Sequence, residues 1–453
     1  MDRQTEVLDS LRHIVDPDLG QDIVSLGFIK NLAIDGSGHV SFTLELTTPA
    51  CPIKEQFRQQ CEDAVRRLPW VTSVSVSLSA RSRTGESNPL LARSRGLERV
   101  WHIIAVSSCK GGVGKSTTAV NLAYCLHQLG AKTGLFDADV YGPSLPTLVS
   151  PVERELFMRN DLIQPLEFEG VRLMSFGFVP SASGGGAAIM RGPMVTQVIN
   201  QLLTGTDWGE LDYLVIDMPP GTGDVQLTLT QIIPITAAVI VTTPQQLSFV
   251  DVVKGIQMFD KLKVPTVAVV ENMSYFVCPD NGKTYYLFGQ GARRKLVEQF
   301  GIRNSFEMPI DPEISRLSDA GTPVVLADPE GPSSRRYREI ASAVVREIEK
   351  LAHSGFARPR VSFSADRGIV LTLPNGEQRV CTPAELRRAC RCAHCVEEFS
   401  GKPLLDPASI PESIHPRSIT PMGNYAVAIT WSDGHSSSIY PYELLMQVTK
   451  PAS

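Results

Sequence analysis

The fold is decided by the stretch Val106-Ser107-Ser108-Cys109-Lys110-Gly111-Gly112-Val113-Gly114-Lys115-Ser116-Thr117. It follows an apolar run, residues 100–106, and precedes a helical pattern over residues 118–129, so it lies at a strand-to-helix turn. Glycines at such a turn let backbone N–H groups surround an anion, and the following helix adds the positive end of its dipole. The stretch therefore predicts a phosphate-binding loop over residues 109–117.

Two side chains of this loop have specific expected contacts. Lys115 would reach the β- and γ-phosphates of a nucleotide, and the hydroxyl of Ser116 would hold Mg²⁺. The general pattern places a glycine five residues before Gly114, where this chain has Cys109. A chance glycine turn is the alternative, but the Gly-Lys-Ser-Thr ending between strand and helix favours nucleotide binding.

Beyond the loop, short apolar runs alternate with helical stretches. The runs cover residues 132–136, 213–217, 237–242 and 266–271. This order predicts an α/β fold with a doubly wound parallel sheet, in which ligands bind at the carboxyl ends of the strands. Asp217 ends one run, where a carboxylate suits Mg²⁺, and Asp139 follows another. Helix capping is the alternative for both aspartates.

Composition limits the class of protein. The chain has 453 residues, 43% of them hydrophobic, and a formal net charge of −5, so two to four globular domains are expected and a nucleic-acid partner is not. The sequence contains no apolar run of about 18 residues, the length that would predict a membrane span. Its first residues lack the pattern of a signal peptide. We expect a cytoplasmic protein with reduced cysteines.

Four segments divide the chain. Residues 1–80 predict a small α+β domain, with helices over 4–15 and 52–68, a hairpin over 31–46 and a strand over 71–78. Residues 81–97 are polar and basic and predict a solvated linker, although their arginines could instead touch a partner. The nucleotide-binding domain is expected over 98–352 and a strand-rich domain over 355–453.

Cysteines mark two further candidate sites. Cys51 lies in a loop at a predicted helix N-terminus, where the helix dipole would lower the thiol pKa and favour metal or cluster ligation. A packed structural cysteine is the alternative there. Cys390, Cys392 and Cys395 stand with His394 within six residues, a density that core packing rarely produces.

The central motifs resemble the Mrp/ApbC family of iron–sulfur cluster carrier ATPases. They are the loop, residues 137–144 (Asp-Ala-Asp-Val-Tyr-Gly-Pro-Ser), 190–194 (Met-Arg-Gly-Pro-Met), 216–224 (Ile-Asp-Met-Pro-Pro-Gly-Thr-Gly-Asp) and 271–274 (Glu-Asn-Met-Ser). The resemblance implies ATP hydrolysis in a sandwich homodimer, with catalytic roles for Lys110, Lys115, Asp139 and Asp217. Lys110 would reach the partner's nucleotide, Asp139 would orient the attacking water, and Asn272 would read adenine, favouring ATP over GTP.

The chain departs from that family at its cluster motif. Carriers of this family usually have Cys-Pro-x-Cys after Asn-Met-Ser, so that two protomers supply four thiolates to a [4Fe–4S] cluster. Here the stretch is Cys278-Pro279-Asp280-Asn281, and a dimer offers two thiolates. Further ligands would have to come from elsewhere, such as Cys51 or a small molecule. This substitution, the Cys109-Lys110-Gly111 spelling and the three-part domain order together indicate a subfamily.

Both end domains also resemble known families. The first resembles the iron–sulfur assembly domain that precedes many Mrp ATPases. The last resembles the N-terminal domain of γ-butyrobetaine hydroxylases, which implies Zn²⁺ ligation by Cys390, Cys392, Cys395 and His435 and leaves His394 as a bystander. The oxygenase domain of that family is absent, so hydroxylation is not implied.

Three functions follow from these patterns. The first is an ATP-dependent scaffold that takes an Fe–S cluster from a donor and transfers it to client apoproteins. The second is a ParA/MinD-like positioning ATPase without a cluster, although the end of the chain, residues 444–451, is too short and too little charged for a membrane-binding helix. The third is an adaptor whose end domains recruit clients while the ATPase gates them.

Overall fold

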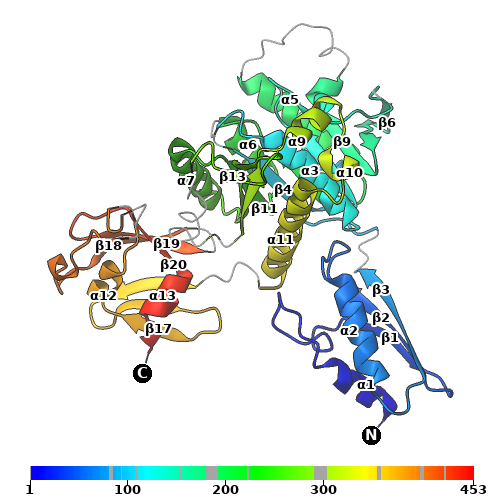
Figure 1. Ribbon diagram of the computed structural model, residues 1–453, viewed down its shortest axis with the longest axis horizontal. Helices are drawn as coiled ribbons and strands as arrows, with labels where there is room; N and C mark the ends of the chain where they lie inside the picture. The colour runs from blue at the N-terminus through cyan, green and yellow to red at the C-terminus, as the bar shows by residue number, and fades with distance from the viewer. Residues whose placement is uncertain are drawn as a thin grey trace.

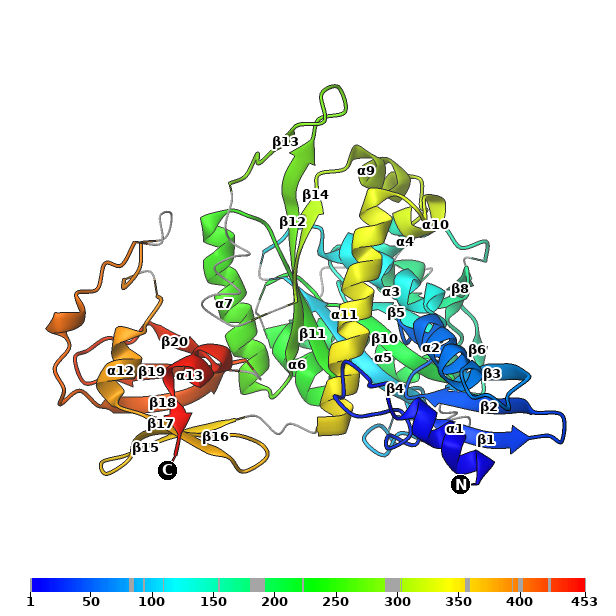
Figure 2. The same cartoon turned by 60° about the horizontal axis from the view of Figure 1, so that its bottom comes forward.

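The computed structural model describes residues 2–80, 85–92, 94–108, 110–153, 155–179, 192–221, 224–289, 302, 304–354, 359–392, 394–397, 402–422 and 425–452. Figure 1 shows a central α/β body with a smaller domain at each end of the chain. In Figure 2 the N-terminal domain lies beside the lower part of α11, and the C-terminal domain lies on the side of α7.

The central domain is built on a nine-stranded sheet with the order β13-β12-β11-β4-β10-β5-β9-β8, in which β14 also pairs with β12. Pairings among β14, β12, β11, β4, β10, β5 and β9 are parallel, which confirms the predicted doubly wound class. The strands are β4 (Val100–Ser107), β5 (Thr133–Asp137), β8 (Leu166–Phe168), β9 (Val171–Ser175), β10 (Leu211–Asp217), β11 (Ala237–Thr242), β12 (Thr266–Val277), β13 (Thr284–Tyr285) and β14 (Ser305–Pro309).

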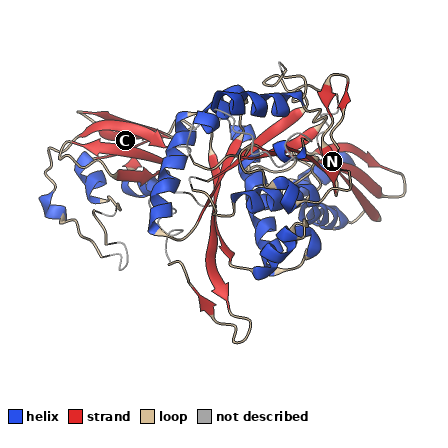
Figure 3. Cartoon of the chain, turned by 90° about the horizontal axis from the view of Figure 1, so that it is seen from above, coloured by secondary structure: helices blue, strands red, loops and turns tan. Residues whose placement is uncertain are grey.

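Helices cover both faces of this sheet, as Figure 3 shows. On one face, α3 and α11 pack over β4, β5, β10, β12 and β14, and on the other lie α5, α6 and α7. The bounds are α3 (Lys115–Gln128), α5 (Gly192–Gly205), α6 (Asp224–Ile232), α7 (Gln246–Lys261) and α11 (Pro332–Ser354). Short elements complete the domain: α4 (Leu145–Leu148), α9 (Pro312–Asp319), α10 (Val324–Ala327), η1 (Phe176–Phe178), β6 (Met158–Arg159) and β7 (Leu162–Ile163).

Strand β4 shows why this sequence forms a strand buried on both faces. Ile104 and Val106 belong to the core under α3 and α11, whereas Ile103 and Ala105 belong to the core under α5, α6 and α7. Successive side chains of a strand point to opposite faces, so a strand covered on both sides is apolar at every position. The run ends at the phosphate loop, which therefore lies at the carboxyl edge of the sheet.

The N-terminal domain has the expected α+β composition. Its sheet has the order β1-β2-β3, where β1 (Ile29–Ile34) is antiparallel and β3 (Ser73–Ala80) parallel to β2 (His39–Leu46). Helix α1 spans Arg3–Leu11, and α2 (Lys54–Arg66) crosses between β2 and β3. Buried residues alternate along β2, as expected for a sheet with one face on the core.

The prediction of a solvated linker is wrong for the described residues of 85–97. Leu91 and Leu97 are buried in the core of the central domain, and Asn88 is buried with its side-chain amide donating to the carbonyl of Val100 over 2.8 Å. Leu90, Leu91 and Leu97 follow no helical or strand period within this polar stretch, so the packing of Leu91 and Leu97 could not be predicted from the sequence. We call residues 85–97 the connector.

The C-terminal domain contains two small sheets, with the orders β15-β16-β17-β21 and β18-β19-β20. Its core also reaches the central domain, because Met422 and Ala426 belong to the cluster under α5, α6 and α7, and the Tyr425 hydroxyl lies 3.5 Å from Asp260 Oδ2 on α7. The elements are β15 (Arg360–Ser364), β16 (Gly368–Thr372), β17 (Gln378–Cys381), α12 (Pro383–Arg388), η2 (Pro407–Ser409), β18 (Pro416–Met422), β19 (Ala426–Trp431), β20 (Ser438–Pro441), α13 (Tyr442–Val448) and β21 (Lys450–Pro451).

Among the described residues, no helix has both the length and the apolar character needed to cross a membrane.

Candidate functional site

The phosphate-type loop joins β4 to α3. Gly112 and Gly114 have φ angles of 74° and 85°, in the left-handed region that glycine adopts without strain. Gly111 and Gly112 are exposed, whereas Val113 and Lys115 are buried. Thr117 is half-buried, and its carbonyl accepts from the amide of Asn121 at 2.9 Å. Cys109 lies outside the described residues, as do Met190 and Arg191.

Lys115 and Asp217 form a buried ion pair at the foot of the loop. Lys115 Nζ also lies 3.3 Å from the hydroxyl of Ser116, and that hydroxyl lies 3.1 Å from the hydroxyl of Ser144. The structure therefore brings together Lys115, Ser116 and Asp217. This arrangement is the one expected for residues that bind the same nucleotide. Their roles stay predictions.

The structure adds Asp137, a residue to which the sequence analysis gave no role. Strand pairing places Asp137 on β5 directly beside Asp217 on β10. Asp137 Oδ2 accepts from the backbone N–H groups of Ser144 and Leu145 at 3.0 and 3.1 Å and from the hydroxyl of Ser175 at 3.0 Å. Strand register brings the two carboxylates together, and register cannot be read from two separate motifs.

Two buried carboxylates beside one lysine leave an excess of negative charge. Burial raises the pKa of Asp137 to about 7, with the neighbouring Asp217 adding to the effect, and burial also raises the pKa of Asp217 against the opposing charge of Lys115. A divalent cation relieves such an excess, and carboxylate and hydroxyl oxygens are the ligands that Mg²⁺ prefers. The donor set of Asp137, Asp217 and Ser116 therefore fits Mg²⁺.

Asp139 lies at the rim of this group and is half-buried. Its Oδ1 accepts from the backbone N–H of Gly142 at 3.2 Å, and its own N–H donates to Asp137 Oδ1 at 3.0 Å. The side chain thus caps a turn, which is close to the alternative that the sequence left open. The proposed contact with an attacking water stays a prediction.

Lys110 and Asn272 flank the loop. Lys110 is exposed, and its Nζ lies 3.3 Å from Gln245 Oε1 at the start of α7. The Asn272 amide donates to the carbonyl of Val113 at 2.9 Å, and a Cβ on Gly114 would lie only 2.1 Å from its nitrogen. Asn272 therefore braces the loop in this structure, and its contact with adenine stays a prediction.

Cys278 stands on an arm that projects from the central domain. Strand β12 continues past the sheet and returns through β13, and Figures 2 and 3 show this hairpin extending beyond the body. The turn is closed by Cys278 N–H, which donates to the carbonyl of Lys283 at 2.9 Å. Beyond the turn follow four exposed apolar side chains: Tyr285, Tyr286, Leu287 and Phe288.

Cys51 lies elsewhere, at the junction of the N-terminal and central domains. Its neighbour Ala50 is fully buried in the core under α3 and α11, and the adjacent Thr48 hydroxyl lies 3.1 Å from the hydroxyl of Tyr213. Burial raises the pKa of Cys51 to about 11, so the expectation of a thiol acidified by a helix dipole is wrong. Nearby carboxylates of Asp16 and Asp18 act in the same direction.

Within one chain the structure keeps Cys51 and Cys278 apart. The charge of Glu349, near the end of α11, acts on Cys51, whereas Tyr275, three residues before Cys278, hydrogen-bonds to Arg336 near the beginning of that helix. These two positions are about 20 Å apart along a helix that rises 1.5 Å per residue. Cluster ligation by Cys51 stays a prediction, but it cannot be shared with Cys278 of the same chain in this arrangement.

The second candidate site is in the C-terminal domain, where Cys390, Cys392, Cys395 and His435 place their ligand atoms within 4.8 Å of one another. The Nε2 atom of His435 lies 3.5, 3.3 and 3.7 Å from the three sulfurs in chain order. Tetrahedral Zn²⁺ with Zn–S of about 2.3 Å and Zn–N of about 2.0 Å would separate nitrogen from sulfur by about 3.5 Å. The donor set and its spacing therefore fit one zinc ion.

His394 is not part of this group. Its side chain is exposed, its Nδ1 lies 3.3 Å from the hydroxyl of Ser437, and its ring is edge-on to that of His435 at 6.2 Å. Without a metal, the hydrogen bond between Cys390 and Cys392 lowers the pKa of Cys392 and raises that of Cys390, as expected where neighbouring thiols share a proton.

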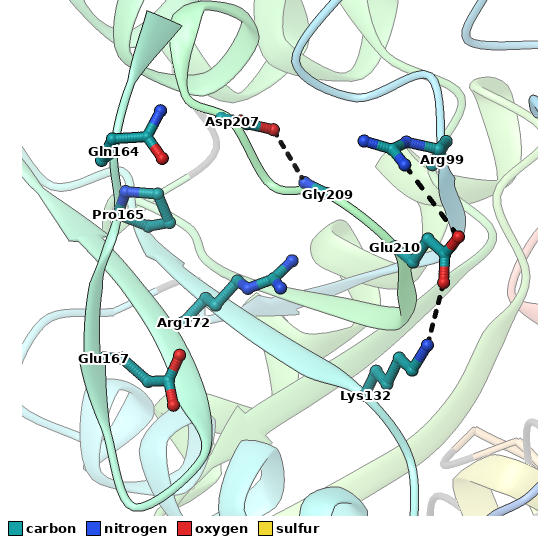
Figure 4. A pocket seen from close by; sticks show the side chains of 9 residues that line it. All are labelled: Arg99, Lys132, Gln164, Pro165, Glu167, Arg172, Asp207, Gly209 and Glu210. Carbon is teal, nitrogen blue, oxygen red and sulfur yellow. Dashed lines mark hydrogen bonds and ion pairs between the residues drawn. The ribbon is translucent and has the colours of Figure 1, made fainter. Parts of the chain in front are cut away.

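A third feature is a polar pocket of about 490 Å³ at the opposite edge of the central sheet, shown in Figure 4. Arg99, Lys132 and Glu210 line it and directly precede β4, β5 and β10. Glu210 pairs with Lys132 at 2.9 Å and with Arg99 at 3.9 Å, and it accepts from the backbone N–H of Gly85 at 3.0 Å. This carboxylate therefore anchors the start of the connector and lies away from the nucleotide site.

Comparison with known proteins assigns a family to each part. Residues 99–345 match the family described as NUBPL iron-transfer P-loop NTPase, residues 4–77 the family of iron–sulfur cluster assembly proteins, and residues 363–446 the N-terminal domain of γ-butyrobetaine hydroxylase-like proteins. These matches confirm the resemblances that the motifs indicated.

Individual relatives extend the similarity over the whole chain. The "Fe-S cluster assembly factor HCF101, chloroplastic" of Oryza sativa subsp. japonica is 52% identical over 98% of this chain and 82% of its own length. The protein of the same name from Arabidopsis thaliana is 51% identical over 99% and 83%. An "Iron-sulfur cluster carrier protein" of Deinococcus radiodurans is 43% identical over 76% of this chain and 95% of its own. The chain therefore belongs to the NUBPL iron-transfer P-loop NTPase family, in a form that joins an iron–sulfur assembly domain and a γ-butyrobetaine hydroxylase-like domain to the NTPase.

Proposed function

We propose that this protein is an ATP hydrolase that binds an iron–sulfur cluster as cargo and transfers it to client apoproteins. ATP binding would close a homodimer and hydrolysis would open it. The names of its relatives support the cargo, since they are described as an Fe–S cluster assembly factor and as cluster carriers.

The observation that carries this proposal is the course of strand β12. At Asn272 the strand holds the phosphate loop through the carbonyl of Val113, and it continues to Val277, directly before Cys278. A strand rises about 3.3 Å per residue, so this one strand joins the nucleotide loop to the cargo thiol over at most about 20 Å, with a register shift between Glu271 and Tyr275. A change at the loop on nucleotide binding can thus move the arm that carries Cys278.

The hydrolytic roles follow from the charges around the loop. Lys115 would leave Asp217 for the phosphates, and the carboxylates of Asp137 and Asp217 with the Ser116 hydroxyl would hold Mg²⁺. When bound, Mg²⁺ neutralises negative charge on the phosphates while the γ-phosphoryl group is transferred to water. Asp139 would orient that water. Lys110, whose exposed side chain places Nζ 3.3 Å from Gln245 Oε1, would reach the nucleotide of the second protomer.

The cargo site has fewer thiolates from the protein than a [4Fe–4S] cluster takes. Two copies of Cys278 provide two thiolates, whereas a [4Fe–4S] cluster takes four. We propose that the remaining positions are filled by small thiols or by the client's own cysteines. A cluster that is held partly by exchangeable ligands can be transferred from this protein to a client more easily than one held by four of its own thiolates.

The C-terminal site would hold a structural Zn²⁺, since three thiolates and one imidazole fill a tetrahedral shell and leave no open position. His435→Ala should release zinc from the full-length protein, whereas His394→Ala should not, as measured by metal analysis after dialysis. The cytoplasmic location expected from the sequence stays a prediction, and the two plant relatives are described as chloroplastic.

The test of the main function is anaerobic reconstitution followed by transfer to an apoprotein that requires a [4Fe–4S] cluster. We expect the full-length protein to bind iron and sulfide in equal amounts and to activate the apoprotein, with Mg²⁺-ATP changing the transfer rate. Lys115→Ala should still bind the cluster but lose hydrolysis and the effect of ATP. ATP hydrolysis without any bound iron would reject cluster transfer and support a positioning ATPase or an adaptor.

A further inference from the structure

Two of the three sulfurs of the C-terminal metal site accept a hydrogen bond from a serine or arginine side chain. The Ser437 hydroxyl donates to Cys392 Sγ over 3.4 Å and Arg387 Nη1 donates to Cys395 Sγ over 3.3 Å, whereas Cys390 Sγ donates to the Ser438 hydroxyl over 3.5 Å. Donors directed at sulfur stabilise the anionic thiolate, which is the form that binds metal. Arg387 is the charged member of this set.

Arg387 is itself buried, which is uncommon for a guanidinium. Only 5% of the residue is exposed, and its second contact is an ion pair in which Nε donates to Asp433 Oδ2 at 2.9 Å. A buried charge needs a partner and filled hydrogen bonds. Asp433 neutralises the guanidinium, and the thiolate of Cys395 receives a charge-assisted N–H bond that neither serine can supply.

The same two side chains connect the segments that bring the ligands together. Arg387 belongs to α12, which directly precedes the three cysteines, whereas Asp433 lies in the turn between β19 and β20, and its Oδ1 accepts from the backbone N–H of His435 at 2.9 Å. One guanidinium thus holds the third sulfur ligand and, through Asp433, the turn that carries the imidazole.

We infer that Arg387 is a positioning residue of this metal site. It sets Cys395 and His435 at metal-binding distance before the ion arrives, and it lowers the electron density on the thiolate once the ion is bound. The inference rests on the proposed zinc site and is independent of cluster transfer. Groups of this kind around a metal's ligands typically change its affinity by about 10- to 100-fold.

The test uses the full-length protein loaded with Zn²⁺ and a chromophoric chelator as competitor. Arg387→Met keeps the length of the side chain but removes its donors, and it should weaken zinc retention by about 10- to 100-fold. Arg387→Lys keeps the positive charge but cannot contact Cys395 and Asp433 with the geometry of a guanidinium. Its zinc retention should lie between that of Arg387→Met and that of the parent. Arg388→Met is the matched control, because Arg388 is the next residue of α12 and bonds to the carbonyls of Pro407 and Ile410, away from the sulfurs.

A second readout separates positioning from general destabilisation. With Co²⁺ in place of Zn²⁺, loss of the N–H donor in Arg387→Met should leave Cys395 more electron-rich and move the sulfur-to-cobalt charge-transfer band to longer wavelength, with a smaller shift in Arg387→Lys. An unchanged band together with unchanged retention would overturn the inference, as would an equal loss in Arg388→Met. A parent protein that binds neither ion would overturn the zinc site itself, which is a different outcome.

Discussion

Asp137→Asn is the substitution that probes the nucleotide site most directly. In the metal-free protein the ionised Asp137 is buried beside Asp217, and its pKa is raised from 3.8 to about 7. At 1.36 kcal/mol for each pH unit between these values, ionisation costs on the order of 4 kcal/mol of folding free energy above pH 7. Asparagine has nearly the same shape and carries no such cost.

The sign of the pH effect follows from proton binding. Between pH 4 and pH 7 the folded state binds more protons at this position than the unfolded state, so the parent loses stability as pH rises through that window. The variant lacks this loss. Its amide nitrogen cannot accept from Asp139 N–H, which costs about 1–3 kcal/mol at every pH. The difference in unfolding free energy, variant minus parent, should therefore rise by about 3 kcal/mol from pH 5 to pH 8.

Thermal unfolding in EDTA at several pH values measures this difference. For a domain of this size, 3 kcal/mol corresponds to a relative rise in Tm of roughly 5–10 °C. Adding Mg²⁺ and ATP should give the parent the higher Tm, because the cation stabilises the ionised Asp137 of the parent. The variant has one carboxylate fewer with which to bind the cation. A Tm difference that does not change with pH would refute the raised pKa, and equal stabilisation of both proteins by Mg²⁺-ATP would refute the role of Asp137 at the metal.

Three other changes test the remaining parts of the molecule. Lys110→Ala should retain ATP binding but weaken ATP-induced dimerisation, and an ATP-bound parent that stays monomeric in light scattering would reject the sandwich. Cys278→Ser should lower iron content after reconstitution, whereas Cys51→Ser should lower it only if the buried junction opens; parent-like content in both would place the cargo elsewhere. Leu97→Ala should lower the free energy of unfolding of the central domain by about 2–5 kcal/mol, as measured with denaturant. A change below about 0.5 kcal/mol would show that the connector is a solvated linker after all.

Much of the fold could be predicted because its signals are local. Apolar runs such as that before the phosphate loop specify parallel strands without any knowledge of their neighbours, and the Gly-Lys-Ser-Thr ending specifies the turn that follows. The zinc-type cysteines are also local, since three of four ligands stand within six residues. Only the fourth, His435, needs a hairpin to reach them.

The parts that could not be predicted depend on contacts between distant segments. Asp137 gains its place from strand register with Asp217, 80 residues later in the chain. The raised pKa of Cys51 depends on burial at a domain junction, near carboxylates that include Glu349 from the far end of the central domain. Asn272 meets the loop 159 residues before it. Periodicity and spacing carry no information about such encounters.

The connector changes how this protein can be divided. A cut at residue 98, where sequence motifs place the start of the NTPase, would remove Leu91 and Leu97 from its core and free the carbonyl of Val100 from Asn88. Laboratory grafting of the first domain must therefore leave residues 85–97 with the NTPase domain and not with the domain that precedes it. In this structure the boundary between the two domains lies upstream of residue 98.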